Sequence, residues 1–157
     1  MGHADIQERA GEHASIAGKR VLLAEDEPSA RAILAKVLRK MGLDVIETGD
    51  GGRLLVAITS YDKDGRTPDD LDLVITDVRM PVMSGLEIFK DLRAAHWTLP
   101  VIVMTAHESA EVSDAVLRYG AALLIKPLDL DVLESLVTRM LQRPRVIAVA
   151  PPASSKR

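Results

Sequence analysis

Three acidic residues in this sequence come directly after short apolar runs, and their side chains could hold one cation. Glu25 and Asp26 follow the run at 21–24, and Asp77 follows the run at 71–76. Carboxylates that lie close together at neutral pH either retain a proton or bind a divalent cation. Oxygen ligands without any His or Cys favour Mg²⁺. We therefore predict that these three residues form a magnesium site.

Asp77 is also the residue that we expect to react. A carboxylate beside Mg²⁺ can attack a phosphoryl donor and form an aspartyl phosphate, and this transfer depends mainly on positioning and on neutralising the phosphoryl oxygens. Lys126 follows the run at 121–125 and would supply a further positive charge, while the Thr105 hydroxyl would donate to a phosphoryl oxygen. The added charge on Asp77 would then move Thr105 and the loop after it. These residue types predict a phosphorylation-dependent switch.

These side chains meet only if the apolar runs are strands of one parallel sheet. Each run is short and bounded by turn residues, which is typical of a buried strand. Helical patterns separate the runs, so we predict an α/β three-layer sandwich with right-handed crossovers and helices on both faces. The carboxyl ends of its strands share one edge. The predicted strands are 21–24, 43–47, 71–76, 100–105 and 121–125, and the predicted helices are 28–41, 53–60, 86–95, 109–119 and 129–141.

Composition limits the class of protein. The 157 residues suffice for one domain, and with 47% hydrophobic but 3% aromatic residues its core must be aliphatic. A formal charge of -3 argues against direct binding to nucleic acid, and the absence of cysteine excludes disulfides and thiolate chemistry. No apolar run is long enough to insert in a membrane, and residues 1–19 lack the apolar core of a signal peptide. We expect a cytoplasmic protein.

The chain divides into three parts. Residues 1–18 form a polar extension that we expect to be ordered weakly if at all, because Gly11 and Gly18 interrupt any helix. Residues 19–142 form the domain, within which the polar loop 61–70 is long for its kind of connection. Residues 143–157 form a tail with a short apolar run, which either docks on a partner or simply ends the fragment.

The chemical residues and their turn residues resemble the receiver domain of bacterial two-component response regulators. The resemblance covers about residues 19–142 and is closest to receivers of the nitrogen-regulator type, in which an ATPase and a DNA-binding domain usually follow. It implies a flavodoxin-like (βα)5 fold with a five-stranded parallel sheet in the order 2-1-3-4-5. The matching residues are Glu25-Asp26-Glu27-Pro28, Asp77, Met80-Pro81, Ser84-Gly85, Thr105-Ala106 and Lys126-Pro127.

The resemblance implies a role for each residue around the cation. Asp77 matches the phosphoacceptor, Asp26 matches a direct ligand of Mg²⁺, and Glu25 matches a ligand that acts through water. The backbone carbonyl of Arg79 would complete the metal site. Arg79 and His107 also occupy positions that adjust the lifetime of the phosphoryl group in this family.

The resemblance also implies partners and a conformational change. Thr105 matches the switch hydroxyl, Lys126 matches the lysine that contacts the phosphoryl group, and the peptide bond before Pro127 would be cis. The phosphoryl group would come from a sensor histidine kinase or a phosphotransfer protein. An unknown downstream protein would bind the face formed by 109–119, 121–125 and 129–141.

Two departures from the family pattern bear on switching. Glu25 stands where aspartate is more common, which is a frequent variant. The segment 120–126 is one residue shorter than usual, and Leu123 stands where the family often has Tyr or Phe. The aromatic ring that swings inward with the threonine is therefore missing, so coupling runs through Thr105 and the following helix alone, or it is weak.

Other interpretations fit parts of the pattern. An aspartate at a strand end is often only a turn or cap residue, and a receiver-like scaffold would bind a partner without phosphorylation. A phosphatase with an aspartyl nucleophile usually carries a second aspartate where this chain has Arg79. A flavin-binding module is disfavoured because Glu25, Asp26 and Glu27 would repel a phosphate. We expect no enzyme beyond catalysis of its own phosphorylation and dephosphorylation.

Overall fold

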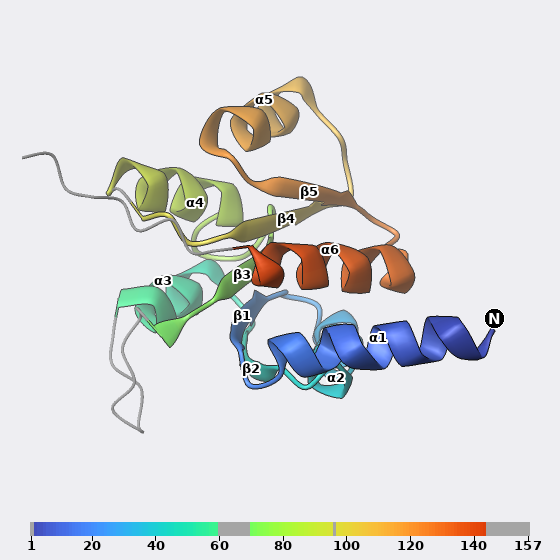
Figure 1. Ribbon diagram of the computed structural model, residues 1–157. Helices are drawn as coiled ribbons and strands as arrows, with labels where there is room; N and C mark the ends of the chain where they lie inside the picture. Colours follow the sequence, from blue (N-terminus) through green and yellow to red (C-terminus); the bar gives the residue numbers. More distant parts are fainter. Residues whose placement is uncertain (1, 60–69, 96, 144–157) are drawn as a thin grey trace, which may run out of the picture.

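The structure, a computed structural model, describes residues 2–59, 70–95 and 97–143. Within these residues the strands form a parallel five-stranded sheet in the order β2-β1-β3-β4-β5 (Figure 1). This order confirms the predicted fold, and each strand lies within two residues of its predicted bounds. The strands are β1 Arg20–Ala24, β2 Asp44–Thr48, β3 Leu73–Asp77, β4 Val101–Thr105 and β5 Ala122–Ile125.

The helices begin and end where local chemistry favours it. The carboxylate of Glu27 accepts hydrogen bonds from the first N–H groups of one helix, and Ser84 and Asp129 cap two others in the same way. Gly120 follows a further helix in a left-handed conformation, which ends that helix. The helices are α1 His3–Ile16, α2 Pro28–Lys40, α3 Gly51–Thr59, α4 Gly85–Ala94, α5 Ala110–Tyr119 and α6 Leu130–Gln142.

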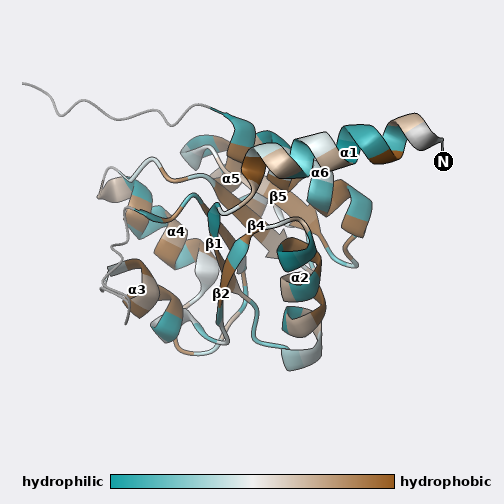
Figure 2. Ribbon diagram, turned by 60° about the horizontal axis from the view of Figure 1, so that its bottom comes forward, coloured by the Kyte–Doolittle hydropathy of each residue, from teal (hydrophilic) through white to brown (hydrophobic). Residues whose placement is uncertain are grey.

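Two aliphatic layers cover the faces of the sheet. On one face α2 and α6 pack on the strands, and on the other face α3, α4 and α5 do so. All residues of β1, β3 and β4 are buried, and Figure 2 shows mainly hydrophobic colouring in the centre of the sheet, with helices of mixed colouring around it. Phe89 is the aromatic residue among the largest fully buried side chains. The expectation of an aliphatic core is therefore met within the described residues.

The N-terminal residues differ from our expectation. Residues 3–16 form the helix α1, so the prediction of weak order for 1–18 was wrong over this part. Ile16 explains the difference, because its side chain is 0% exposed and joins the core cluster of α2 and α6. Gly11 sits inside the helix, where glycine costs about 1 kcal/mol but does not forbid it. Gly18, with φ 78°, lies just past the helix end.

The helix α1 runs alongside α6 in the same direction. Arg9 Nη1 lies 3.2 Å from Asp131 Oδ1 near the start of α6, and Gln142 Nε2 donates to Ser15 Oγ at 3.1 Å near its end. Since Asp131 is the second residue of α6, residues 3–8 project past the start of that helix. Figure 1 shows this N-terminal end extending beyond α6 on the side where β5 leads into it.

Three sequence predictions fall outside the described residues. They are most of the loop at 61–70, the tail after residue 143, and the apolar run at 146–149. Among the helices that the structure does describe, none combines the length and apolar character needed to cross a bilayer.

Candidate functional site

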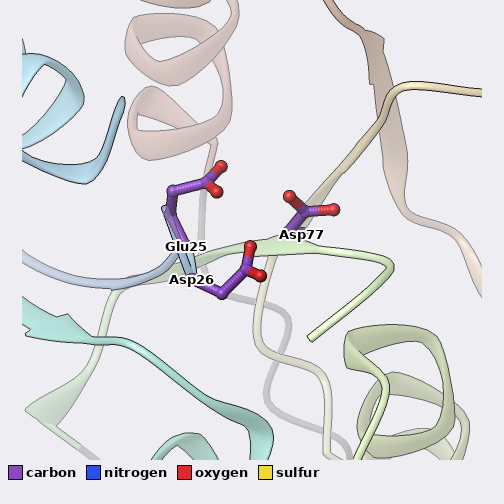
Figure 3. Close-up of side chains that lie close together, drawn as sticks. All are labelled: Glu25, Asp26 and Asp77. Atoms are coloured by element: carbon purple, nitrogen blue, oxygen red, sulfur yellow. The ribbon is translucent and has the colours of Figure 1, made fainter. Parts of the chain in front are cut away.

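The acidic residues meet at the carboxyl edge of the sheet. Ala24 and Thr76 are partners in the β1–β3 register, so the residues that follow them, Glu25 and Asp77, emerge side by side. Asp26 follows from the same β1–α2 loop. One carboxylate oxygen from each of the three lies within 4.8 Å of the others, and Figure 3 shows the three carboxyl groups around one space. Glu25 and Asp77 are buried, whereas Asp26 is exposed.

Lys126 lies between the two buried carboxylates. Its Nζ is 2.7 Å from Glu25 Oε2 and 2.5 Å from Asp77 Oδ2. Its backbone N–H donates to the carbonyl of Thr105 at 2.8 Å, which extends the β4–β5 pairing to this residue. The peptide bond between Lys126 and Pro127 is cis, as the resemblance implied. The lysine predicted for the site therefore contacts both carboxylates directly.

Backbone N–H groups hold the remaining oxygens of these carboxylates. Glu27 donates its N–H to Glu25 Oε1 at 3.1 Å, and Arg79 donates its N–H to Asp77 Oδ1 at 3.2 Å. Among the described residues, the Asp26 carboxylate has no hydrogen-bond or ion-pair partner. The Arg79 backbone lies beside the cluster, while the role of its carbonyl as a ligand stays a prediction.

Burial and charge shift the protonation of the central groups. Burial raises the pKa of Glu25, and the nearby charge of Asp77 raises it further, although hydrogen bonds from Lys126 and the Glu27 N–H act in the opposite direction. Burial alone would lower the pKa of Lys126, but its hydrogen bonds to Asp77 and Glu25 outweigh this effect and raise it. Lys126 therefore stays charged at neutral pH and offsets part of the acidic charge.

The loop between β3 and α4 passes close over the strand end. The N–H of Gly85 donates to the carbonyl of Val78 at 3.1 Å. A Cβ at Gly85 would lie 2.1 Å from the carbonyl oxygen of Asp77 and 2.4 Å from Thr76 Oγ1. Only glycine allows this approach, so Gly85 fixes how the loop leaves Asp77.

The tip of this loop carries a residue that the sequence analysis did not single out. Val82 has φ 74° and is 86% exposed. A β-branched residue in the left-handed region is an outlier. The tip packs on the start of α3, where a Cβ at Gly51 would lie 1.9 Å from the Met83 carbonyl oxygen. The left-handed residue Val82 therefore lies next to a segment that is in close contact with the start of α3.

The structure does not place the Thr105 hydroxyl on the acidic cluster. Thr105 is buried at the end of β4, but its Oγ1 donates to the carbonyl of His107 at 2.9 Å and accepts from the His107 N–H at 3.2 Å. His107 is exposed in the loop that follows. Leu123 is half-buried and packs against the core layer of α3, α4 and α5. Thr105, the predicted switch residue, therefore lies at the carboxyl edge of the sheet as expected. Its hydroxyl, however, is hydrogen-bonded to the loop that follows β4 and not to the acidic cluster.

A basic residue missed by the sequence analysis contacts the acidic loop from behind. Arg31 Nη1 donates to the backbone carbonyl of Glu25 at 2.8 Å. Arg31 lies between apolar positions of the α2 stripe, and nothing in that spacing distinguishes it from a solvent-facing arginine. Its role depends on its bond to the loop just before the helix, which the helical pattern does not encode.

The residues of the cluster fit a magnesium ion. They supply oxygen ligands alone, and three carboxylates face one ammonium, so a net negative charge remains for a cation. Asp26 has an unpaired carboxylate, and Glu25 and Asp77 each keep lone pairs beyond those engaged by Lys126 and the backbone. Glu25, Asp26 and Asp77 are thus the residues that would hold Mg²⁺.

Comparisons with known proteins agree with this geometry. Residues 21–138 match the family model of the response regulator receiver domain. The DNA-binding transcriptional regulator NtrC of Salmonella typhimurium is 34% identical over 141 residues, which cover 85% of this chain and 28% of that regulator. The sensor protein EvgS of Escherichia coli K12 is 37% identical over 134 residues, which cover 83% of this chain and 10% of the sensor. The chain thus spans less than a third of these relatives.

Solved structures show the same fold. The receiver domain of the Francisella response regulator 1452 superposes with a TM-score of 0.69 at 26% identity, covering 79% of this chain and 97% of that one. The chemotaxis protein CheY4 of Vibrio cholerae superposes with a TM-score of 0.64 at 28% identity, covering 79% and 99%. With its family model, relatives and fold in agreement, the chain belongs to the receiver domains of two-component response regulators.

Proposed function

We propose that this receiver domain accepts a phosphoryl group on Asp77 in a Mg²⁺-dependent reaction and that phosphorylation changes its binding to a partner. One observation supports this most directly: Lys126 Nζ contacts both Asp77 and Glu25, and Asp26 completes a cluster of ligand atoms within 4.8 Å. This arrangement combines a nucleophilic carboxylate, a fixed positive charge and the ligands of a divalent cation.

The chemical step is a displacement at phosphorus. An oxygen of Asp77 attacks the phosphorus atom of the donor, forming the O–P bond of an acyl phosphate, while the bond from phosphorus to the leaving group breaks and its electron pair departs with that group. Lys126 moves from Asp77 to a transferred oxygen and keeps its charge throughout. When bound, Mg²⁺ would neutralise charge on the phosphoryl oxygens. Glu25 and Asp26 would hold the ion.

The response to phosphorylation starts at Thr105. To donate to a phosphoryl oxygen, its hydroxyl has to leave the His107 carbonyl that it now contacts at 2.9 Å. The loop at 105–109 then has to rearrange, and it leads directly into α5. Because Leu123 carries no ring to follow this movement, the change passes through the loop and α5.

The phosphodonor in this proposal is a sensor histidine kinase or a phosphotransfer protein. The downstream protein binds the face of α5, β5 and α6, where Ile125 and Val132 are exposed at 43% and 50%. The domain works in the cytoplasm and catalyses only its own phosphorylation and dephosphorylation. These statements extend to the chain what its family membership implies.

The test is the intact mass of the protein after incubation with acetyl phosphate. We expect the wild type to gain the mass of one phosphoryl group with Mg²⁺ present and to gain none when the metal is chelated. Asp77→Asn should gain none in either condition. Asp72→Asn is the matched control, because the Asp72 carboxylate accepts a hydrogen bond from the Arg20 N–H at the opposite edge of the sheet, away from the cluster.

One alternative is supported by particular residues. The Thr105 hydroxyl is bonded to its own loop, and Leu123 replaces the family's aromatic ring, as they would in a scaffold that binds a partner without phosphorylation. The mass measurement separates the two functions. Absence of any mass gain in the wild type would overturn the phosphoacceptor proposal and favour the scaffold.

A further inference from the structure

The guanidinium of Arg31 bonds to the backbone of the acidic loop and not to its carboxylates. Arg31 is the fourth residue of α2, and its Nη1 donates to the carbonyl oxygen of Glu25 at 2.8 Å. Its Nε lies 3.9 Å from Glu47 Oε1, and its side chain is 24% exposed. A hydrogen bond from a charged donor is stronger than one between neutral groups. The loop is thereby tied to a rigid helix.

This contact matters because the orientation of Asp26 depends on the backbone around it. The N–H of Glu25 donates to the Thr48 carbonyl at 3.1 Å, and Glu25 Oε1 accepts the N–H of Glu27. The exposed Asp26 carboxylate has no partner among the described residues. Its direction therefore follows from the backbone on which it stands.

The peptide between Glu25 and Asp26 is the unit that Arg31 fixes. A peptide group is planar, so a bond to its carbonyl oxygen restricts the orientation of this plane and with it the position of the Asp26 Cα, from which the side chain leaves. We infer that Arg31 is a positioning residue, which sets the Glu25–Asp26 peptide so that both carboxylates face the cation. This inference rests on the proposed function, since it presumes that the cluster binds Mg²⁺.

Gly49 provides an independent observation on the same contact. A Cβ at Gly49 would lie 2.8 Å from Arg31 Nη1, 3.6 Å from its Cζ and 4.0 Å from its Nη2, and these are the three nearest atoms. The guanidinium thus occupies space that only a glycine leaves open. Since the end of an arginine side chain moves easily, an alanine at this position would displace Arg31 from the Glu25 carbonyl without disturbing the backbone.

Arg39 is a matched control on the same helix. Its Nη2 lies 2.9 Å from Glu47 Oε2 and donates to the Val45 carbonyl at 3.2 Å. Arg39 therefore shares with Arg31 its charge, its helix and its acidic neighbour, but it does not contact the acidic loop. A difference between the two arginines isolates the bond to Glu25.

The experiment measures Mg²⁺ binding itself, by isothermal titration of each protein with magnesium chloride. We expect Arg31→Gln to raise the Kd for Mg²⁺ by about tenfold, the lower end of the effect seen when a group that orients metal ligands is removed. Gly49→Ala should raise it in the same direction, and Arg39→Gln should leave it unchanged. With acetyl phosphate, Arg31→Gln should need more Mg²⁺ for half-maximal phosphorylation but reach the wild-type rate at saturation.

Each outcome decides between a positioning role and another role. An unchanged Kd in both Arg31→Gln and Gly49→Ala would overturn the inference, and so would an equal rise in Arg39→Gln, which would indicate a general effect of charge. If the wild type binds Mg²⁺ but gains no phosphoryl mass, the proposed function fails while the positioning role stands. Unfolding in urea, measured on every variant, ensures that only folded proteins are compared.

Discussion

The ammonium of Lys126 lies 2.7 Å from the carboxylate of Glu25, although 101 residues separate them along the chain. The same nitrogen contacts Asp77, and Asp26 lies within 4.8 Å of both carboxylates. One positive charge thus faces three negative charges, two of them buried. The native fold keeps these negative charges close together. Substitutions that change the charge of the cluster should therefore change the free energy of unfolding.

Removing the Lys126 charge should destabilise the metal-free protein. Lys126→Met leaves Glu25 and Asp77 buried without their cation, so we expect the free energy of unfolding at neutral pH to fall by about 2 kcal/mol. Mg²⁺ should then stabilise the variant more than the wild type, since the metal replaces the missing charge. Urea unfolding with chelator and with Mg²⁺ checks both effects. Lys36→Met, on the exposed face of α2, is the control, and an equal loss there would contradict the interpretation.

The burial of Glu25 predicts a pH dependence with a definite sign. The pKa of Glu25 is raised in the folded protein above its ordinary value of 4.5, first by burial and then by Asp77. Its ionised form therefore opposes folding, and this cost develops as the pH rises from 4.5 through the raised pKa. Glu25→Gln removes the cost, so we expect the metal-free variant to be more stable by about 1 kcal/mol near neutral pH. The gain should vanish at acidic pH, and a constant gain in urea titrations at several pH values would refute the argument.

Much of the fold follows from short-range patterns in the chain. The buried strands β1, β3 and β4 consist mainly of apolar residues, and Asp129 and Gly120 mark helix ends by their chemistry. The parallel direction follows from the alternation of strands and helices. The strand order does not follow from periodicity and came from the family resemblance.

Two glycines should respond in opposite ways to alanine. Gly85→Ala places a Cβ 2.1 Å from the Asp77 carbonyl oxygen, which is backbone and cannot yield, so we expect a loss of about 3 kcal/mol. Gly11→Ala lies within α1 with no atom within 4 Å of the added Cβ, and the higher helix propensity of alanine should add about 1 kcal/mol. Thermal unfolding of both variants provides the comparison. If Gly85→Ala were as stable as the wild type, the loop after Asp77 could not pass as close to the Asp77 carbonyl oxygen as it does in this structure.

The left-handed backbone at Val82 predicts that asparagine is preferred there. Val82 has φ 74° and is 86% exposed, so little packing is lost on substitution. Asparagine tolerates this conformation far better than a β-branched residue, and Val82→Asn should gain about 1 kcal/mol. Val56→Asn, at a 60% exposed position of α3, should gain nothing. The midpoints of urea unfolding of both variants and the wild type measure this difference. A lower midpoint for Val82→Asn than for the wild type would contradict backbone strain at Val82.

The attachment of α1 should depend on its last turn. Ile16 is 0% exposed, so Ile16→Ala should cost about 3 kcal/mol. Arg9 pairs with Asp131 at the surface, with side chains 46% and 66% exposed, so Arg9→Ala should cost about 0.5 kcal/mol or less. Hydrogen exchange should show lost protection over residues 3–12 in Arg9→Ala, with 13–16 unaffected. Equal costs for the two substitutions would mean that α1 is held along its whole length.

The contacts that the sequence analysis missed are not encoded in helical or strand periodicity. Arg31 bonds to the backbone of Glu25, six residues earlier, and Ile16 joins the core of α2 and α6, and the apolar pattern around each residue gives no hint of these partners. By contrast, Asp77 and Lys126 follow strands, so the common edge of a parallel sheet brings them together. The hydroxyl of Thr105 shows the limit of that reasoning, since an edge position does not fix a rotamer.

The direction of α1 has a practical consequence for assays. Because α1 and α6 run in the same direction, residue 2 is carried past the start of α6, to the edge of the sheet where Asp77 lies, while Gln142 lies toward the opposite edge. A purification tag or fluorescent fusion placed before residue 2 would therefore extend from the side of the molecule that carries this edge, where it can hinder a protein donor more than acetyl phosphate. If a fusion at the N-terminal end slows the reaction with a protein donor and a fusion after Gln142 does not, the slow reaction is caused by the fusion and not by the domain.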